Sequence, residues 1–161
     1  MKNIVLNETP VRTSKNYGIN NIEIKDFEEP VIKEFKNIKI TDNENCVLNH
    51  KEEVKLKFGL GEYFLNQSNE QSNVDLKIDI DKKLKEPIII EYNLDKSNNV
   101  LVDNINIDAK EDTKANIIVI YKSQDEIDGY HNGIFNAQIG TNANIHVTIV
   151  NLLNTKISNF Y

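Results

Sequence analysis

A five-residue pattern occurs twice in this 161-residue chain, and it constrains the fold more than any other feature. Residues 113–117 read Thr-Lys-Ala-Asn-Ile, and residues 141–145, at an offset of 28, read Thr-Asn-Ala-Asn-Ile. In both copies a polar loop passes into an apolar segment. A fixed period of roughly 20–50 residues is typical of stacked units that bury a core only against their neighbours. Because each unit has room for two short strands and no helix, the pattern predicts a β-solenoid.

Segments with the composition of strands follow one another from residue 74 onward. Apolar residues alternate with polar ones within them, which is the period of a strand with one buried face. Leu76 and Ile105 are 29 residues apart, and Ile107 and Phe135 are 28 residues apart, so the two-strand unit persists. An antiparallel meander or sandwich is the competing fold, but it gives no reason for a motif repeated at a constant offset. The predicted strands span residues 74–80, 87–94, 100–109, 115–121, 133–139 and 144–153.

The first 73 residues have a different organisation. Short apolar runs around residues 4–6, 22–24 and 38–40 suit short strands or extended arms. Asn49 as an N-cap and Gly59 as a stop predict a helix over residues 50–58, although a strand remains possible because Val54, Leu56 and Phe58 alternate. The polar run 66–73 is predicted to be an exposed loop. We therefore divide the chain into an N-terminal region of extended segments and a short helix, residues 1–73, and a solenoid, residues 74–161.

Composition and charge exclude several classes of function. A net charge of −6 and a pI near 5.1 argue against nucleic acid and anionic membrane surfaces as partners. The sequence has neither a secretory leader pattern nor an apolar run near the ~20 residues of a membrane span. A single cysteine, Cys46, excludes an internal disulfide framework and fits a reducing compartment. We expect a cytoplasmic protein.

Cys46 and His50 form one candidate metal site. At a spacing of i, i+4 they would lie on one face of a helix and could share a metal ion. Two ligands do not complete a zinc or iron site, and no CxxC motif accompanies them. The alternative is a lone structural thiol near a helix start.

The polar, glycine-containing segment 125–133 is a second candidate. Asp128 and His131 could orient each other, or a metal could bind between them. The alternative is a long turn in which His131 bonds to the local backbone, because no nucleophile or second carboxylate accompanies it. His146 alternates with apolar neighbours and is expected to point outward from its strand.

Three aspartates, Asp75, Asp79 and Asp81, share one face of a predicted strand. Carboxylate pairs on a sheet face are the acid and base of many sugar-cleaving enzymes. Lys77 interrupts the row, however, so the expected alternative is a solvated face. No phosphate-binding loop, dinucleotide fingerprint or nucleophile elbow occurs in the chain.

The segment around residues 7–22 is not explained by strand periodicity. It resembles the N-terminal signature of the SufB/SufD family, the scaffold proteins of iron–sulfur cluster assembly. Residues 35–40 and 129–133 are also similar to that family. The most specific part is the pattern Pro-x-Arg-Thr-Ser-x-Asn-Tyr, formed by Pro10, Arg12, Thr13, Ser14, Asn16 and Tyr17.

The resemblance implies a right-handed parallel β-helix behind an N-terminal region. With the sequence pattern, the expected fold class is all-β, with coils of about 28 residues and two strands each, preceded by a small mixed region. The resemblance also implies a non-enzymatic scaffold that acts with the SufC ATPase and with a second SufB/SufD-type chain, as a homodimer or heterodimer.

The resemblance covers about the first half of a typical family member. The family residues implicated in cluster assembly lie in later coils, so no catalytic or cofactor-binding residue carries over, and Cys46, His50 and His131 remain weak metal candidates. The iron–sulfur cluster is implied for the full complex only. We expect the chain to be a truncated piece of a longer protein. The alternatives from other classes are a carbohydrate-active β-helix enzyme and a general β-solenoid interaction domain.

Overall fold

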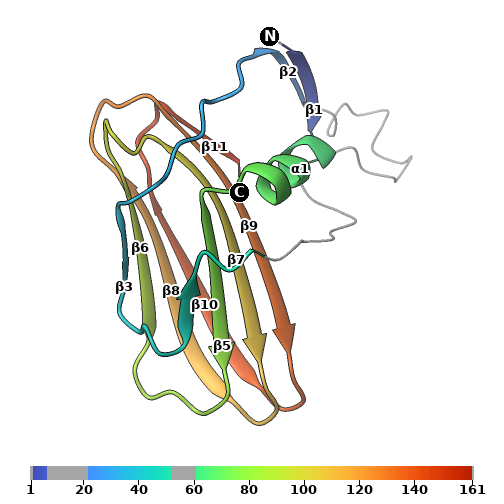
Figure 1. Cartoon of the computed structure of the whole chain (residues 1–161), viewed down its shortest axis with the longest axis vertical. Coiled ribbons are helices and arrows are strands. Elements are labelled where there is room, and N and C mark those ends of the chain that lie inside the picture. Colours follow the sequence, from blue (N-terminus) through green and yellow to red (C-terminus); the bar gives the residue numbers. More distant parts are fainter. Residues whose placement is uncertain (1, 7–21, 52–60, 161) are drawn as a thin grey trace.

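The computed structural model describes residues 2–6, 22–51 and 61–160 (Figure 1). Two sheets share one core, and a helix covers the outer face of one of them. In chain order, the described elements are β1 (Lys2–Leu6), β2 (Ile22–Phe27), β3 (Ile38–Ile40), β4 (Cys46–Leu48), α1 (Glu62–Gln71), β5 (Val74–Ile80), β6 (Ile88–Leu94), β7 (Val100–Ala109), β8 (Lys114–Ser123), β9 (Gly129–Ile139), β10 (Asn144–Leu152) and β11 (Ile157–Phe160).

From β5 onward the chain alternates between the two sheets. The five-stranded sheet has the order β11-β9-β7-β5-β4 and the four-stranded sheet has the order β10-β8-β6-β3. Strands β5 to β11 pair in parallel with their sheet neighbours, whereas β3 and β4 add antiparallel edges to β6 and β5. Strands β1 and β2 form a separate antiparallel pair. The six strands predicted beyond residue 74 are confirmed, with small changes at their ends.

The predicted fold class is wrong. The described chain is mixed α/β and not all-β, because it contains α1, two sheets that each mix parallel and antiparallel pairs, and a third antiparallel pair. The prediction of a right-handed parallel β-helix assumed that the strands repeat at a fixed period along the chain. That reasoning placed its one short helix at residues 50–58 and not at α1, and it did not include the antiparallel edge strands.

The sequence period is not the structural period. The pairing offset is 29 residues between β5 and β7 and between β6 and β8, then 30 from β7 to β9 and from β8 to β10, and 28 from β9 to β11. Leu76 does pair with Ile105, as predicted, but Ile107 pairs with Ala137 and not with Phe135. The repeated motif is displaced by two residues as well, since Lys114 lies beside Asn144. A two-residue displacement leaves every side chain on its predicted face, so the pattern does not reveal it.

The main core lies between the sheets and is filled by their inward rows. Its fully buried side chains include Leu76, Ile78, Ile90 and Ile117. The rings of Tyr92 and Tyr121 stack at 5.1 Å across adjacent strands. A second apolar cluster beneath β1 and β2 joins these strands to α1 and the five-stranded sheet. It is formed by Ile4, Leu6, Phe27, Phe64, Val102 and Tyr130.

The segment before β5 differs from the prediction. The predicted helix over residues 50–58 lies largely outside the described residues; His50 and Lys51 are described and are not helical. The run 66–73, predicted to be an exposed loop, instead forms most of α1. Its polar residues Gln67 and Ser68 are buried because hydrogen bonds from the sheet satisfy them. No helix in the described part of the chain is long and apolar enough to cross a membrane. The division at residue 73 stays a prediction.

Candidate functional site

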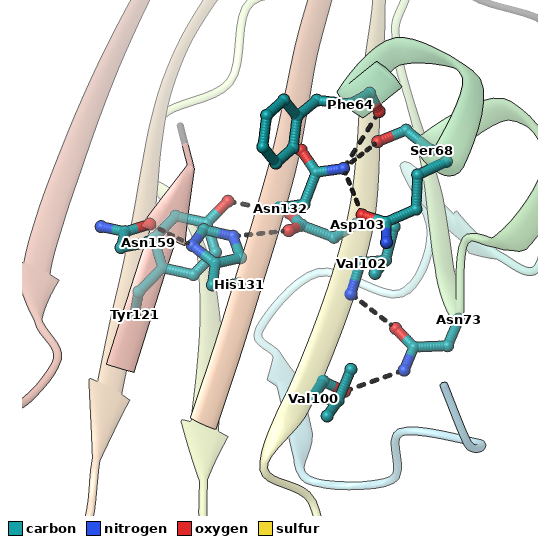
Figure 2. Close-up of polar contacts among 11 residues, drawn as sticks. Phe64, Ser68, Asn73, Val100, Val102, Asp103, Tyr121, His131, Asn132 and Asn159 are labelled. Atoms are coloured by element: carbon teal, nitrogen blue, oxygen red, sulfur yellow. Dashed lines mark hydrogen bonds and ion pairs between the residues drawn. The ribbon is translucent and has the colours of Figure 1, made fainter. Parts of the chain in front are cut away.

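A chain of four polar side chains runs from the core between the sheets to an exposed residue of β11, and we call it the inner polar cluster: the buried Asp103, Tyr121 and His131, and the exposed Asn159. The Asp103 carboxylate accepts a hydrogen bond from the Tyr121 hydroxyl at 2.8 Å and lies 2.8 Å from His131 Nε2 (Figure 2). His131 Nδ1 lies 2.7 Å from Asn159 Oδ1. The cluster therefore connects four strands, of which β8 belongs to the opposite sheet.

Strand periodicity and register place these groups. Asp103 and His131 occupy inward positions of β7 and β9 that would otherwise hold apolar residues, and His131 lies beside Asn159 in the ladder of β9 and β11. Tyr121 reaches Asp103 from the inward row of β8 and packs its ring against the imidazole at 4.4 Å. An ionised carboxylate only accepts hydrogen bonds, so Nε2 donates to Asp103. Asn159 satisfies Nδ1 in either tautomer, because its carboxamide offers an acceptor and a donor.

The geometry limits what the inner polar cluster does chemically. A carboxylate and an imidazole in contact can exchange a proton. Here the side chains of Asp103 and His131 are 0% and 1% exposed, so a substrate has no access to them. The pair therefore acts as a connection between strands, and its integrity depends on both partners remaining in place.

A second set of polar contacts, the outer polar cluster, lies on the opposite face of the same sheet and holds α1. The Asn132 carboxamide donates to Phe64 O, Gln67 Oε1 and Ser68 Oγ at 2.9–3.1 Å (Figure 2). The Asn104 carboxamide donates to Ser68 O at 3.1 Å.

The same outer face carries two further connections to α1 and β5. The Tyr130 hydroxyl donates to Gln67 Oε1 at 2.6 Å, and the Asn104 carboxamide also donates to Asp75 Oδ1 at 2.8 Å. Burial, the largest influence, raises the pKa of the Tyr130 hydroxyl well above its ordinary range. The hydroxyl is therefore neutral and available as a donor.

Asn73 joins α1 to the sheet through its side chain. Its carboxamide donates to Val100 O at 2.9 Å and accepts from Val102 N at 2.8 Å (Figure 2). These are the two backbone groups that a neighbouring peptide unit would bind in a parallel ladder. The Asn73 side chain therefore extends the ladder by one position before β5 begins.

The sequence-predicted candidates are dispersed. Cys46 is buried on the edge strand β4 beside Ile78, and burial raises the pKa of its thiol to about 12. His50 is exposed beyond the end of that strand, so the helical spacing assumed for the two residues does not apply. Among the described residues, no group of three or more His, Cys, Asp or Glu side chains is arranged to hold a metal ion.

His131 has other partners than those predicted. It is buried on β9, not in a turn, and it bonds to Asp103 and Asn159, whereas Asp128 is exposed before β9 begins. The backbone carbonyl of Asp128 instead accepts a hydrogen bond from the Asn99 side chain at 3.0 Å. The structure therefore separates the two members of the predicted Asp–His pair.

The remaining histidine and the three aspartates are placed as follows. His146 is exposed on β10, as predicted. Asp75 is buried and accepts hydrogen bonds from Ser72 and Asn104, whereas Asp79 is half-exposed beside Lys77 and Asp81 is exposed after β5 ends. The three carboxylates do not share one accessible face.

A cleft of about 750 Å³ lies where the loop after β2 approaches the N-terminal ends of β7 and β9. Its rim is mainly acidic. Ion pairing with Lys2 holds the pKa of the Glu29 carboxyl below its usual value, and burial raises the pKa of the neighbouring Tyr63 to about 12. Its charged lining residues are Asp26, Glu28, Glu29, Lys33, Glu34, Lys96 and Asp128.

Sequence reasoning missed Asp103, Tyr121, Asn132 and Asn159. One signal was present, because Asp103, His131 and Asn159 are spaced by 28 residues, the offset of the repeated motif. An ionisable residue in an otherwise apolar inward row, with polar residues at that offset, predicts a buried polar ladder.

Comparison with known proteins adds no relative: no family model, curated protein or solved structure matches this chain. The signature segment that resembles SufB/SufD, residues 10–17, lies outside the described residues.

Proposed function

We propose that this chain is a non-enzymatic scaffold subunit, or a fragment of one, in Suf-type iron–sulfur cluster assembly. It would act in the cytoplasm with the SufC ATPase and with a second SufB/SufD-type chain. The motif of residues 10–17 suggests the family. The scaffold role is supported by one structural observation: the buried polar side chains connect strands to one another or to α1.

In the described part of the chain, Asp103, His131 and Asn132 bond to other strands or to α1. None of them lines the cleft beside the loop after β2 or a second cleft between residues 108–111 and 138–141. Asp75, one of the three carboxylates considered for a sugar-cleaving reaction, is likewise held by Ser72 and Asn104. Side chains used in this way support a rigid frame that positions partners. A reaction centre would instead hold such groups at an accessible surface.

The test is affinity purification of the tagged full-length protein from its native cells, followed by mass spectrometry of the proteins that co-purify. We expect a SufC-type ATPase and a second SufB/SufD-type chain to be enriched over an unrelated tagged control. The proposal is wrong if neither protein is enriched in replicate purifications. Replacing Arg12 by Ala, with Lys15→Ala as the neighbouring control, tests whether the family signature contributes to recovery of the complex.

A further inference from the structure

Helix α1 is attached to the five-stranded sheet mainly by polar contacts. Its buried residues are Phe64, Gln67 and Ser68, so a single fully buried apolar side chain anchors it. The other attachments include the hydrogen bonds from Asn132, Asn104 and Tyr130 in the outer polar cluster. The half-buried Tyr63 of α1 adds an edge-on ring contact with Phe27 at 5.6 Å. The hydrogen bonds are exchanged for bonds to water when the helix leaves, whereas an apolar interface has no such replacement.

The sequence of α1 gives the helix little stability of its own. It has ten residues, and a helix of fewer than about 12–15 residues is marginal in water. Asn66, Ser68 and Asn69 in its middle are weak helix formers. Gly61 at the N-cap provides no capping side chain, and the last turn contains no basic residue. The helix therefore depends on its contact with the sheet.

The sheet depends much less on α1. The main core lies on the inner face, between the two sheets, and α1 covers only the outer face. Below the helix are the amide side chains of Asn104 and Asn132, which water can solvate. The exception is the second apolar cluster, where Phe64 packs with Val102 and Tyr130 of the sheet. The Phe64 ring also stacks on Phe160 at 4.4 Å and lies edge-on to Phe27 at 6.4 Å.

We propose that α1 is a detachable cover, which leaves the outer face of the five-stranded sheet in a local opening while both sheets stay folded. Opening exposes the carboxamides of Asn104 and Asn132. It also exposes the rings of Phe27 and Phe160 against which Phe64 packs. The helix moves about the N-cap Gly61, at φ 146°, and about Ser72, which joins α1 to Asn73. This inference is independent of the proposed scaffold function, because it rests on the attachment of α1 alone.

The test is native-state hydrogen exchange of the full chain, measured by mass spectrometry. In the unaltered protein we expect the amides of α1 to exchange at least about tenfold faster than those of β7 and β9. Ser68→Val places a bulky side chain at a fully buried contact and should accelerate exchange in α1 by at least about tenfold, with the strands unchanged. Asn66→Val is the matched control, because it puts the same residue at an exposed position of the same helix.

A second pair of variants tests the attachment from the sheet side. Asn132→Ala removes three hydrogen bonds to α1, whereas Asn136→Ala, on the same face of β9, removes none to the helix. Only Asn132→Ala should accelerate exchange in α1. The proposal is overturned if α1 and the strands of the unaltered protein exchange as one unit. Equal acceleration of α1 and the strands by both Ser68→Val and Asn132→Ala would also overturn it.

Discussion

Replacing His131 by leucine tests the view that the inner polar cluster holds the two sheets together. The change keeps a side chain of similar size in the core but removes the donor that faces the Asp103 carboxylate. Both groups are essentially inaccessible to water, so the carboxylate left behind cannot recover a water molecule as its partner. The variant should therefore be destabilised far more than a surface substitution.

The magnitude follows from the remaining contacts. Breaking a buried pair by removing one partner costs about 3–5 kcal/mol. The Tyr121 hydroxyl still donates to Asp103, so we expect a loss near the lower limit, about 3 kcal/mol. In urea, with a slope of about 2 kcal/mol per molar, the unfolding midpoint should fall by about 1.5 M.

Two further variants make the assay decisive. His146→Leu is the same substitution on the exposed face of β10 and should change stability by no more than about 0.5 kcal/mol. Combining Asp103→Asn with His131→Leu removes the buried charge as well, so the double variant should be more stable than the sum of the single effects predicts, by about 0.5–3 kcal/mol. The reasoning is refuted if His131→Leu behaves like His146→Leu, or if the two cluster variants are simply additive.

Three other residues, Tyr121, Cys46 and Gly129, give separate predictions. Tyr121→Phe should lower stability by about 1–3 kcal/mol in urea unfolding, because Asp103 loses a buried donor; an unchanged midpoint would contradict the hydrogen bond. The Cys46 thiol, whose pKa burial raises to about 12, should react with a thiol reagent at pH 8 far more slowly in the folded than in the unfolded protein. Because the folded pKa is the higher one, this thiol adds stability that is complete below about pH 9 and is lost as the pH rises toward 12; a pH-independent stability across that range would argue against it. Gly129→Ala should destabilise the protein by about 1–3 kcal/mol in thermal unfolding, since the added carbon would lie 2.7 Å from Asn99 O; an unaltered melting temperature would show that the loop yields.

The strands beyond residue 74 could be predicted because the inward rows alternate with a period of two. Leu76, Ile78 and Ile80 are buried as that period requires. The register could not be predicted in the same way. Ile107 pairs with Ala137 where a constant offset gives Phe135, and both partners lie on the same face of β9. A hydrophobicity pattern cannot distinguish displacements by two residues.

The helix and the polar interior were missed for a different reason. Ser68 and Gln67 look like loop residues because nothing near them in the sequence satisfies their polar groups. Their partner Asn132 lies 64 and 65 residues away. Hydrogen bonds over such separations become visible only when the sheet is assembled, so a local reading places these residues at the surface.

The side chain of Asn73 has a consequence for how α1 returns to its place. Because Asn73 stays bound to the ladder through Val100 and Val102, a released α1 remains tethered by one residue, Ser72, to a fixed point of the sheet. Rebinding is then intramolecular, at an effective concentration of the order of millimolar or higher for so short a tether. A free helix that competes for the same face at micromolar concentration would bind only if its own affinity exceeded that of α1 by about a thousandfold. The short connection at residue 73 therefore makes the outer face selective, because weakly binding segments cannot displace α1.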